Sequence, residues 1–243
     1  MKIVINGAGG RMGRVLRAMI DKGCRGMELA AMVDPFIQEE GMLQSLQAFT
    51  GEADCVIDFS NHAGTQALLE YAVERNLPVV IATTGHTEQE LAAVAAAARK
   101  IPVFRSGNMS LGIALLVELA RQAARMFPDA DIEIVESHHN QKLDVPSGTA
   151  LMLAKAVQDA RPDSYLQVGR HENGKRTKQE IGIHSLRMGN TVGIHEVIVN
   201  TGTQIITLKH EAQDRALFAE GALAAAAFLA QQAPGLYTME DIV

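Results

Sequence analysis

The chain has 243 residues, of which 47% are hydrophobic and 21% charged, an ordinary composition for one large globular domain or two modest ones. The formal net charge of −6 argues against nucleic acid as the main partner, and no uncharged apolar stretch reaches the roughly 20 residues of a membrane span. The apolar run after Met1 is too short for a signal peptide, and Cys24 and Cys55 form no C-x-x-C motif, so we expect a cytoplasmic protein with reduced cysteines.

The first half of the chain alternates between short apolar strands and helices. Strands are expected over residues 3–5, 29–33, 55–59, 78–82 and 102–105, and helices over residues 14–20, 63–75 and 88–100. This alternation indicates a parallel sheet with right-handed crossovers, and the apolar strands indicate burial on both faces of that sheet. The fold class predicted for this half is therefore α/β, with a Rossmann-type parallel sheet.

The pattern changes in the second half. A long apolar helix is expected over residues 111–126, and a strand with one solvated face follows over 131–137. A helix over 147–160 precedes three consecutive strands, over 180–188, 193–200 and 204–211, and an alanine-rich helix over 215–232 ends the pattern. Because no helices separate these strands, we expect a mixed or antiparallel open sheet in a second, smaller α+β domain.

A glycine loop joins the first expected strand to the first expected helix. Its spacing is G-x-x-G-x-x-G rather than the usual G-x-G-x-x-G. Glycine permits positive φ and a close backbone approach to a pyrophosphate, and the following helix start adds partial positive charge. The loop therefore predicts a dinucleotide site, the alternative being a purely structural turn. The expected cofactor contacts are Gly7, Ala8, Gly9, Gly10, Arg11 and Met12.

Asp34 ends the second expected strand, where a carboxylate can accept hydrogen bonds from the adenosine ribose hydroxyls and repel a 2′-phosphate. Its neighbours Pro35 and Phe36 carry no positive charge, which favours NADH over NADPH. The alternative is that Asp34 only caps the strand end. Further cofactor contacts are expected beyond the carboxyl ends of the fourth and fifth strands, at Ala82, Thr83, Thr84, Ser106, Gly107, Asn108 and Met109.

Residues 136–150 end a strand and begin a helix. Ser147 is a favourable helix N-cap, and Gly148 and Thr149 would present backbone N–H groups to an anion. Lys142 supplies a mobile positive charge. Together these features predict a carboxylate-binding pocket, the alternative being an ordinary capped helix.

His138 and His139, in the same segment, can donate a proton or hydrogen bonds near neutral pH. Adjacent histidines project in different directions from a strand, and no third ligand lies at a useful local spacing, so no metal site is expected. A serine nucleophile is disfavoured because no G-x-S-x-G motif surrounds Ser147. Two surface histidines without a catalytic role remain the alternative.

The segment ESHHNQKLDVPSGTA resembles the signature of the 4-hydroxy-tetrahydrodipicolinate reductases, also called dihydrodipicolinate reductases. The glycine loop GAGGRMG is also typical of that family. So are the motifs at residues 58–60, 83–85, 108–110, 187–195 and 210–222. The resemblance covers essentially the whole chain.

By this resemblance, residues 1–108 and 214–243 form the dinucleotide-binding domain. Residues 109–213 form the substrate-binding and oligomerisation domain, whose sheet builds a homotetramer in the family. The implied reaction is the NAD(P)H-dependent reduction of a small dianion, 4-hydroxy-tetrahydrodipicolinate, to tetrahydrodipicolinate in lysine and diaminopimelate biosynthesis. Neither nucleic acid nor a membrane is an expected partner.

The resemblance also implies roles for particular residues. His138 or Lys142 would donate the proton, and substrate contacts would come from His139, Ser147, Gly148 and Thr149. Family members that use both cofactors often carry a basic residue after the acidic strand end, where this chain has Pro35 and Phe36. We therefore expect a preference for NADH, with NADPH use left open.

Two other functions are compatible with the glycine loop. Another two-domain NAD-dependent dehydrogenase would lack the signature over residues 138–150. A non-catalytic NAD(H)-binding regulator would be expected to lose His138 or Lys142, and both are present.

Overall fold

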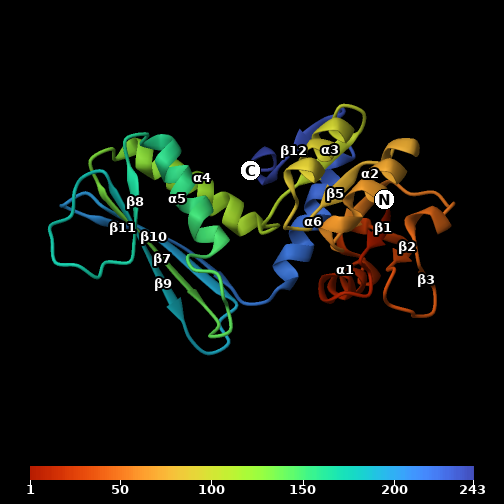
Figure 1. The fold of residues 1–243 in the computed structure, drawn as a ribbon, viewed down its shortest axis with the longest axis horizontal. Helices are drawn as coiled ribbons and strands as arrows, with labels where there is room; N and C mark the ends of the chain where they lie inside the picture. Colours follow the sequence, from red (N-terminus) through yellow and green to blue (C-terminus); the bar gives the residue numbers. More distant parts are fainter. The chain divides into compact units, whose positions relative to one another are not determined.

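A computed structural model describes all residues, 1–243. The chain divides into two compact units, one made of residues 1–111 and 216–242 and the other of residues 112–215 with the terminal Val243. Each unit has its own sheet (Figure 1). Each also has its own hydrophobic core. No helix combines the length and apolar composition that crossing a membrane requires. Cys24 and Cys55 are both free thiols.

The first unit is built on a seven-stranded parallel sheet in the order β12-β6-β5-β4-β1-β2-β3. Its strands are β1 (Lys2–Asn6), β2 (Glu28–Val33), β3 (Met42–Leu43), β4 (Cys55–Asp58), β5 (Val79–Ile81), β6 (Pro102–Arg105) and β12 (Gly235–Tyr237). Strand β4 is buried along its whole length, and β1 is buried at every residue but Lys2, because helices cover both faces of the sheet, as the apolar sequences predicted.

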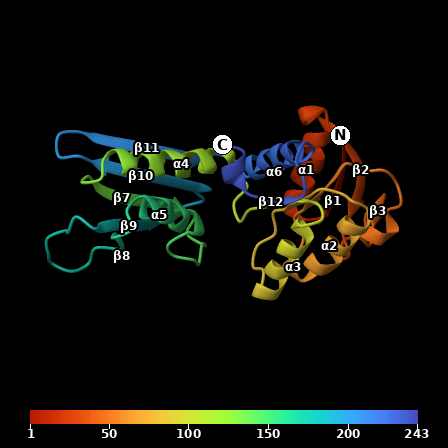
Figure 2. The same cartoon turned by 90° about the horizontal axis from the view of Figure 1, so that it is seen from above.

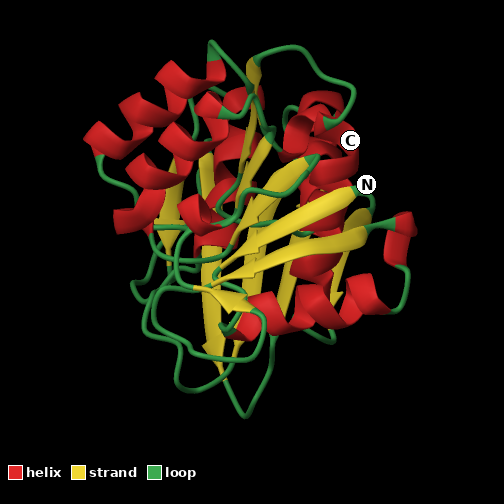
Figure 3. Ribbon diagram, turned by 90° about the vertical axis from the view of Figure 1, so that its right-hand side faces the viewer, coloured by secondary structure: helices red, strands yellow, loops and turns green.

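Four helices belong to this unit, namely α1 (Arg11–Asp21), α2 (Thr65–Glu74), α3 (Glu88–Ala98) and α6 (Ala216–Leu229). Helix α1 packs with α6, and α2 packs with α3, so helices lie on both sides of the strands (Figure 3). Short 3-10 turns cover Cys24–Gly26, Leu46–Ala48, His62–Gly64 and Met239–Asp241. Gly221 on α6 must be glycine, because an added Cβ would lie 1.6 Å from the carbonyl oxygen of Met109.

The second unit contains a mixed five-stranded sheet in the order β11-β10-β7-β9-β8. Its strands are β7 (Asp131–His138), β8 (Tyr165–Val168), β9 (Glu180–Arg187), β10 (Gly193–Asn200) and β11 (Ile205–Ala212). Strand β10 is antiparallel to β7 and β11, whereas β9 is parallel to β7 and β8. The predicted fold class, a parallel α/β sheet plus a mixed sheet, is confirmed.

Helices α4 (Leu111–Met126) and α5 (Gly148–Ala160) pack on one face of this mixed sheet (Figure 2). On β7, Ile132 and Ile134 point into the core beneath the helices. Side chains alternate along a strand, so Glu136 and His138 point to the same face and are also buried. The register of β7 therefore carries an acidic and a basic group into the helix-covered side of the sheet.

Candidate active site

The glycine loop packs too tightly for side chains. Gly7 has φ +82°, and a Cβ there would lie 2.7 Å from the backbone of Phe59. A Cβ on Gly13 would lie 2.2 Å from the carbonyl oxygen of Gly7. Gly10 is the N-cap of α1 and no side chain caps this helix. The amino-terminal N–H groups of α1, in Arg11 and Met12 among others, are therefore available to an anion such as a pyrophosphate.

Asp34 lies beside this loop and is buried. Its Oδ1 accepts the backbone N–H groups of Phe36 at 3.0 Å and Ile37 at 3.1 Å, and its Oδ2 accepts that of Gly9 at 3.1 Å. Asp34 therefore does cap the end of its strand, which was the structural alternative to ribose binding. This role does not exclude ribose binding, because Oδ2 has one N–H partner and a carboxylate oxygen can accept two.

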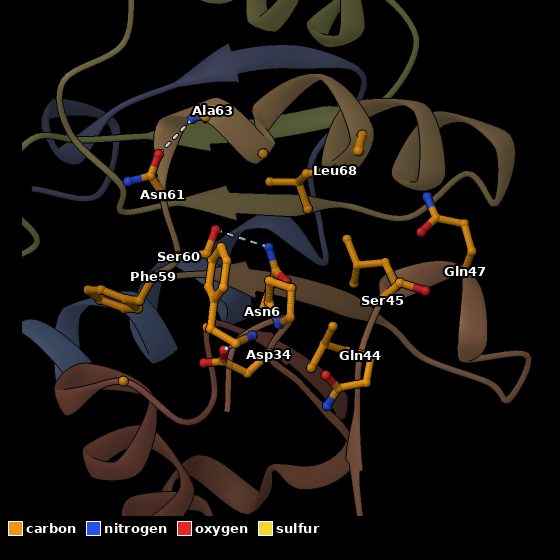
Figure 4. A pocket seen from close by; sticks show the side chains of 18 residues that line it. Asn6, Asp34, Gln44, Ser45, Gln47, Phe59, Ser60, Asn61, Ala63 and Leu68 are labelled. Atoms are coloured by element: carbon orange, nitrogen blue, oxygen red, sulfur yellow. Dashed lines mark hydrogen bonds between the residues drawn. The ribbon is translucent and has the colours of Figure 1, made fainter. Parts of the chain in front are cut away.

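A pocket of about 750 Å³ opens beside Asp34 and the glycine loop (Figure 4). Its size falls within the range of ligand sites in proteins. Polar side chains reach it from several loops, and Phe36 at its margin is 86% exposed. Its polar lining includes Asn6, Asp34, Gln44, Ser45, Gln47, Ser60 and Asn61. The pocket and the uncapped helix fit one half of a dinucleotide.

Asp58 lies in one of the family motifs, for which the sequence alone predicts no role, and its side chain joins three strand ends. Its carboxylate accepts hydrogen bonds from Asn6 Nδ2 at 2.7 Å, Ser60 Oγ at 2.6 Å and Thr83 Oγ1 at 2.6 Å. It is 1% exposed. The predicted cofactor residue Thr83 is therefore held by this buried carboxylate at the end of β5.

The other predicted cofactor residues of this unit lie after β5 and β6. Ser106 Oγ donates to the carbonyl oxygen of Asn108 at 2.7 Å, which closes a tight turn around Gly107. Thr84 is exposed, Ala82 is half-buried and Met109 is buried. Ala8, in the glycine loop, is fully buried. Thr84 and Gly107, exposed at the carboxyl edge of the sheet, have the access that a ligand contact requires.

The second cluster of polar groups lies in the other unit, around Glu136. Arg187 forms two parallel hydrogen bonds with its carboxylate, at 2.8 and 2.9 Å. His138 Nδ1 lies 2.5 Å from Oε2, and the backbone N–H of Ser147 donates to Oε1 at 3.2 Å. Burial opposes ionisation of Glu136, but the hydrogen bonds from Arg187 and its other neighbours outweigh burial and lower its pKa to about 2. The carboxylate is therefore ionised at neutral pH.

His138 is buried at the end of β7, so it is not a surface histidine. Burial lowers its pKa below the ordinary value of 6.5, and the charges of Lys142 and Arg187 act in the same direction against the effect of Glu136. Its ring meets the His195 ring edge-on, with centroids 5.1 Å apart. A ligand that brings negative charge would raise the pKa of His138 again.

Ser147 is the N-cap of α5, as its sequence context predicted. Its Oγ accepts the backbone N–H of Ala150 at 3.2 Å and lies 3.1 Å from His195 Nε2. Burial, followed by the nearby His138, lowers the pKa of His195 to about 4, so His195 is neutral at pH 7. Gly148 and Thr149 form the first turn of α5.

Lys142 and His139 lie in the loop between β7 and α5. Lys142 Nζ forms an ion pair with Asp144 Oδ1 at 2.7 Å, and its backbone N–H donates to the carbonyl oxygen of His139 at 3.1 Å. Lys142 retains 21% side-chain exposure, so its ammonium can reach a ligand. The six predicted catalytic and substrate residues lie at the end of β7, in the loop that follows it and at the start of α5.

Glu136, His138 and His195 have ligand atoms within 4.8 Å of one another, a spacing that suits a metal ion. The spacing of residues along the sequence could not predict this triplet, because His195 comes from β10, a strand distant in sequence that pairs with β7. Both oxygens of Glu136 are engaged by Arg187, and Lys142 adds further positive charge. These cations disfavour a divalent ion, and the expected absence of a metal stays a prediction.

A parallel sheet with a glycine loop, joined in one chain to a unit that holds a buried acid–base cluster, defines a two-domain NAD(P)-dependent oxidoreductase. The sequence pattern of the dihydrodipicolinate reductase N-terminus matches residues 1–109, and that of its C-terminus matches residues 112–243. The chain therefore belongs to the dihydrodipicolinate reductase family.

Full-length relatives agree with this assignment. The chain is 47% identical to the 4-hydroxy-tetrahydrodipicolinate reductase of Caldanaerobacter subterraneus, over 100% of this chain and 98% of the relative. It is 41% identical to that of Roseobacter denitrificans, over 100% and 97%. The structure of dipicolinate-bound dihydrodipicolinate reductase from Paenisporosarcina sp. TG-14 superposes with a TM-score of 0.85 at 26% identity, covering 100% and 99% of the two chains.

More distant structures share the fold alone, for example a myo-inositol dehydrogenase from Corynebacterium glutamicum at 18% identity and a TM-score of 0.59. The predicted family and reductase activity in lysine and diaminopimelate biosynthesis are confirmed, as is NAD(P)H as the family's cofactor. The domain roles, the residue roles and the preference between NADH and NADPH stay predictions.

Proposed function

We propose that the protein reduces 4-hydroxy-tetrahydrodipicolinate at the end of β7, with His138 as the proton donor and NADH as the preferred cofactor. The observation that carries this proposal is the hydrogen bond of buried His138 to ionised Glu136, beside the start of α5 capped by Ser147. That arrangement supports a proton donor at His138 beside a helix start that can bind an anion.

The unit of residues 1–111 and 216–242 is the proposed cofactor domain. The uncapped start of α1 supports pyrophosphate binding, and the pocket beside Asp34 supports binding of the adenosine half. Thr83, Thr84 and Asn108 are the proposed contacts at the other end of the cofactor. When bound, the reduced nicotinamide supplies the hydride.

The preference for NADH follows from the charges around the loop after β2. The carboxylate of Asp34 would repel a 2′-phosphate, and Pro35 and Phe36 offer no compensating cation. Arg17 on α1 is already bound by Glu39 in two hydrogen bonds, at 2.6 and 3.1 Å. Its guanidinium is therefore not available to a phosphate without breaking that pair.

The substrate carries two carboxylates, and the second unit offers two cationic or N–H-rich places. One carboxylate would bind at the start of α5, at Gly148 and Thr149, where the helix dipole favours an anion. The other would replace Asp144 as the partner of Lys142, assisted by His139. The bound dianion raises the pKa of His138, and the protonated ring then delivers its proton to the site where negative charge develops.

We also propose a homotetramer assembled through the mixed sheet of residues 112–215, in the cytoplasm. Helices α4 and α5 cover one face of that sheet. The other face carries the partly exposed apolar side chains Val135, Ile194 and Ile198 in paired strands. Light scattering should therefore give four times the mass of the 26.1 kDa chain.

Titration with pyridine-2,6-dicarboxylate, a planar dianion, tests the site directly. Calorimetry should show saturable binding with one molecule per chain, weakened by added salt because both contacts are electrostatic. Binding that is unchanged in Lys142→Ala and in Ser147→Ala would place the substrate elsewhere.

A further inference from the structure

Glu136 lies at the centre of the substrate site but takes no part in the proton or hydride transfer described above. Its carboxylate is 0% exposed and contacts four groups from three parts of the chain. These are both terminal nitrogens of Arg187, Nδ1 of His138 and the backbone N–H of Ser147. A buried charge with this many partners organises its neighbours, because each partner loses a hydrogen bond if the carboxylate moves.

Arg187 extends this arrangement to the loop after β7. Its Nη2 donates to the carbonyl oxygen of Asp144 at 2.7 Å and to Glu136 at 2.8 Å. The guanidinium therefore joins β9, the end of β7 and the loop that carries Lys142. A planar guanidinium with two parallel bonds holds a carboxylate in orientation as well as in place.

The charge of Glu136 determines where the hydrogen on His138 lies. An ionised carboxylate can only accept hydrogen bonds, so Nδ1 of His138 must carry the hydrogen in their contact at 2.5 Å. The Nε2 atom is then the ring nitrogen left to exchange a proton with a ligand. Gly193 keeps the space beside Nε2 open, because a Cβ there would lie 3.1 Å from it.

We propose that Glu136, held by Arg187, is a positioning residue that imposes the Nδ1–H tautomer on His138 and couples that ring to the start of α5. The inference rests on the proposed function in one respect, namely that His138 is the proton donor. The same carboxylate binds the acid and the N–H of Ser147, so it sets the spacing between the proton and the bound anion.

Four charged or titratable side chains, each from a different part of the unit, lie around the His138 ring. They are Glu136 from β7, Arg187 from β9, His195 from β10 and Lys142 from the loop. Replacing Glu136 with a neutral residue leaves the two cations facing the ring. Protonation of His138 then becomes harder, and the pH at which activity falls should move downward.

The test is Glu136→Gln, which keeps the shape of the side chain and removes its charge. Imidazole ¹H–¹⁵N spectra of the parent at pH 8 should show the Nδ1–H tautomer for His138, and the variant should show the Nε2–H tautomer or a mixture. Turnover should fall by roughly 100-fold, the scale of a mispositioned acid, while the Kd for NADH stays unchanged. The pH midpoint of kcat/KM should fall.

Glu133→Gln is the matched control. Glu133 lies on the same strand, bonds Arg176 and lies 2.9 Å from His184 Nε2, but points to the opposite face. It should leave the tautomer of His138 unchanged. If Glu136→Gln does not fold, the double variant Glu136→Gln/Arg187→Met removes both charges together, which avoids an unpaired buried cation.

The tautomer measurement separates this inference from the proposed function, because it requires no turnover. A parent that fails to reduce the substrate would overturn the proposed function, while the spectra would still decide the role of Glu136. An Nε2–H tautomer in the parent would overturn the inference, even if no variant folds. So would an unchanged Nδ1–H tautomer and an unchanged pH midpoint in Glu136→Gln.

Discussion

The Oδ2 atom of Asp34 accepts the backbone N–H of Gly9 at 3.1 Å, so the carboxylate expected to bind ribose also fastens the glycine loop. Asp34→Ala should therefore have two effects. It should weaken NADH binding more than NADPH binding, because the repulsion of a 2′-phosphate disappears with the charge. It should also destabilise the fold by about 1–3 kcal/mol, the cost of leaving the buried N–H of Gly9 and the partly buried N–H groups of Phe36 and Ile37 without their acceptor.

Fluorescence titrations with both cofactors and urea unfolding of the parent and variant measure these effects. Glu39→Ala is a useful comparison, because it frees Arg17 and should improve NADPH binding without touching Asp34. A parent that binds and uses NADPH as well as NADH would contradict the assigned preference.

Lys142 is proposed to bind one of the two substrate carboxylates. Lys142→Ala should therefore weaken inhibition by pyridine-2,6-dicarboxylate far more than inhibition by pyridine-2-carboxylate, because the monoanion can bind at the start of α5 alone. The fold should survive, since Lys142 lies in a loop and pairs only with the exposed Asp144 among the acidic side chains. Inhibition constants should be compared at one ionic strength. Equal weakening of both inhibitors would place Lys142 outside the pocket.

The buried histidines predict how stability depends on pH. Burial lowers the pKa of His195 to about 4, against 6.5 in the unfolded chain. Above pH 6.5 the ring is neutral in both states and has no effect. As pH falls from 6.5 to 4, the unfolded state takes up a proton that the folded state does not, so stability is lost. The loss amounts to roughly 3 kcal/mol.

Urea unfolding at pH 7.5 and pH 4.5 measures this loss. The difference between the two pH values should be smaller in His195→Gln than in the parent, whatever the variant's own stability. His171→Gln changes an exposed loop residue and is the control. Between pH 7.5 and pH 4.5 this variant should lose as much stability as the parent does. Parallel pH dependences in the parent and His195→Gln would show that His195 is not buried as a neutral ring.

Most of the regular structure could be predicted because its periodicity is local. The apolar strands of the first half and the helix over Leu111–Met126 follow from side-chain patterns along single segments. Strands β3, β8 and β12 were not predicted. They are two to four residues long and lie at sheet edges, where pairing with a neighbour rather than the sequence pattern makes them strands.

The residues of the candidate site also fall into those that local sequence predicts and those that depend on strand pairing. His138, Lys142 and Ser147 are close in sequence, so a motif could place them together. Arg187 and His195 reach the site only because β9 and β10 pair on either side of β7, and pairing partners cannot be deduced from local spacing. The segment 187–195 is the one signal in the sequence for both residues, because it is typical of the family although local spacing predicts no role for it.

The central claim is that this chain reduces 4-hydroxy-tetrahydrodipicolinate with His138 as the acid. The most direct measurement is NADH oxidation at 340 nm, coupled to a synthase that makes the unstable substrate from pyruvate and aspartate semialdehyde. The parent should oxidise NADH only when both synthase substrates are present, and His138→Gln should be slower by roughly 100-fold with the same Kd for NADH. No substrate-dependent oxidation by the parent, or turnover of His138→Gln within a few-fold of the parent, would contradict the account.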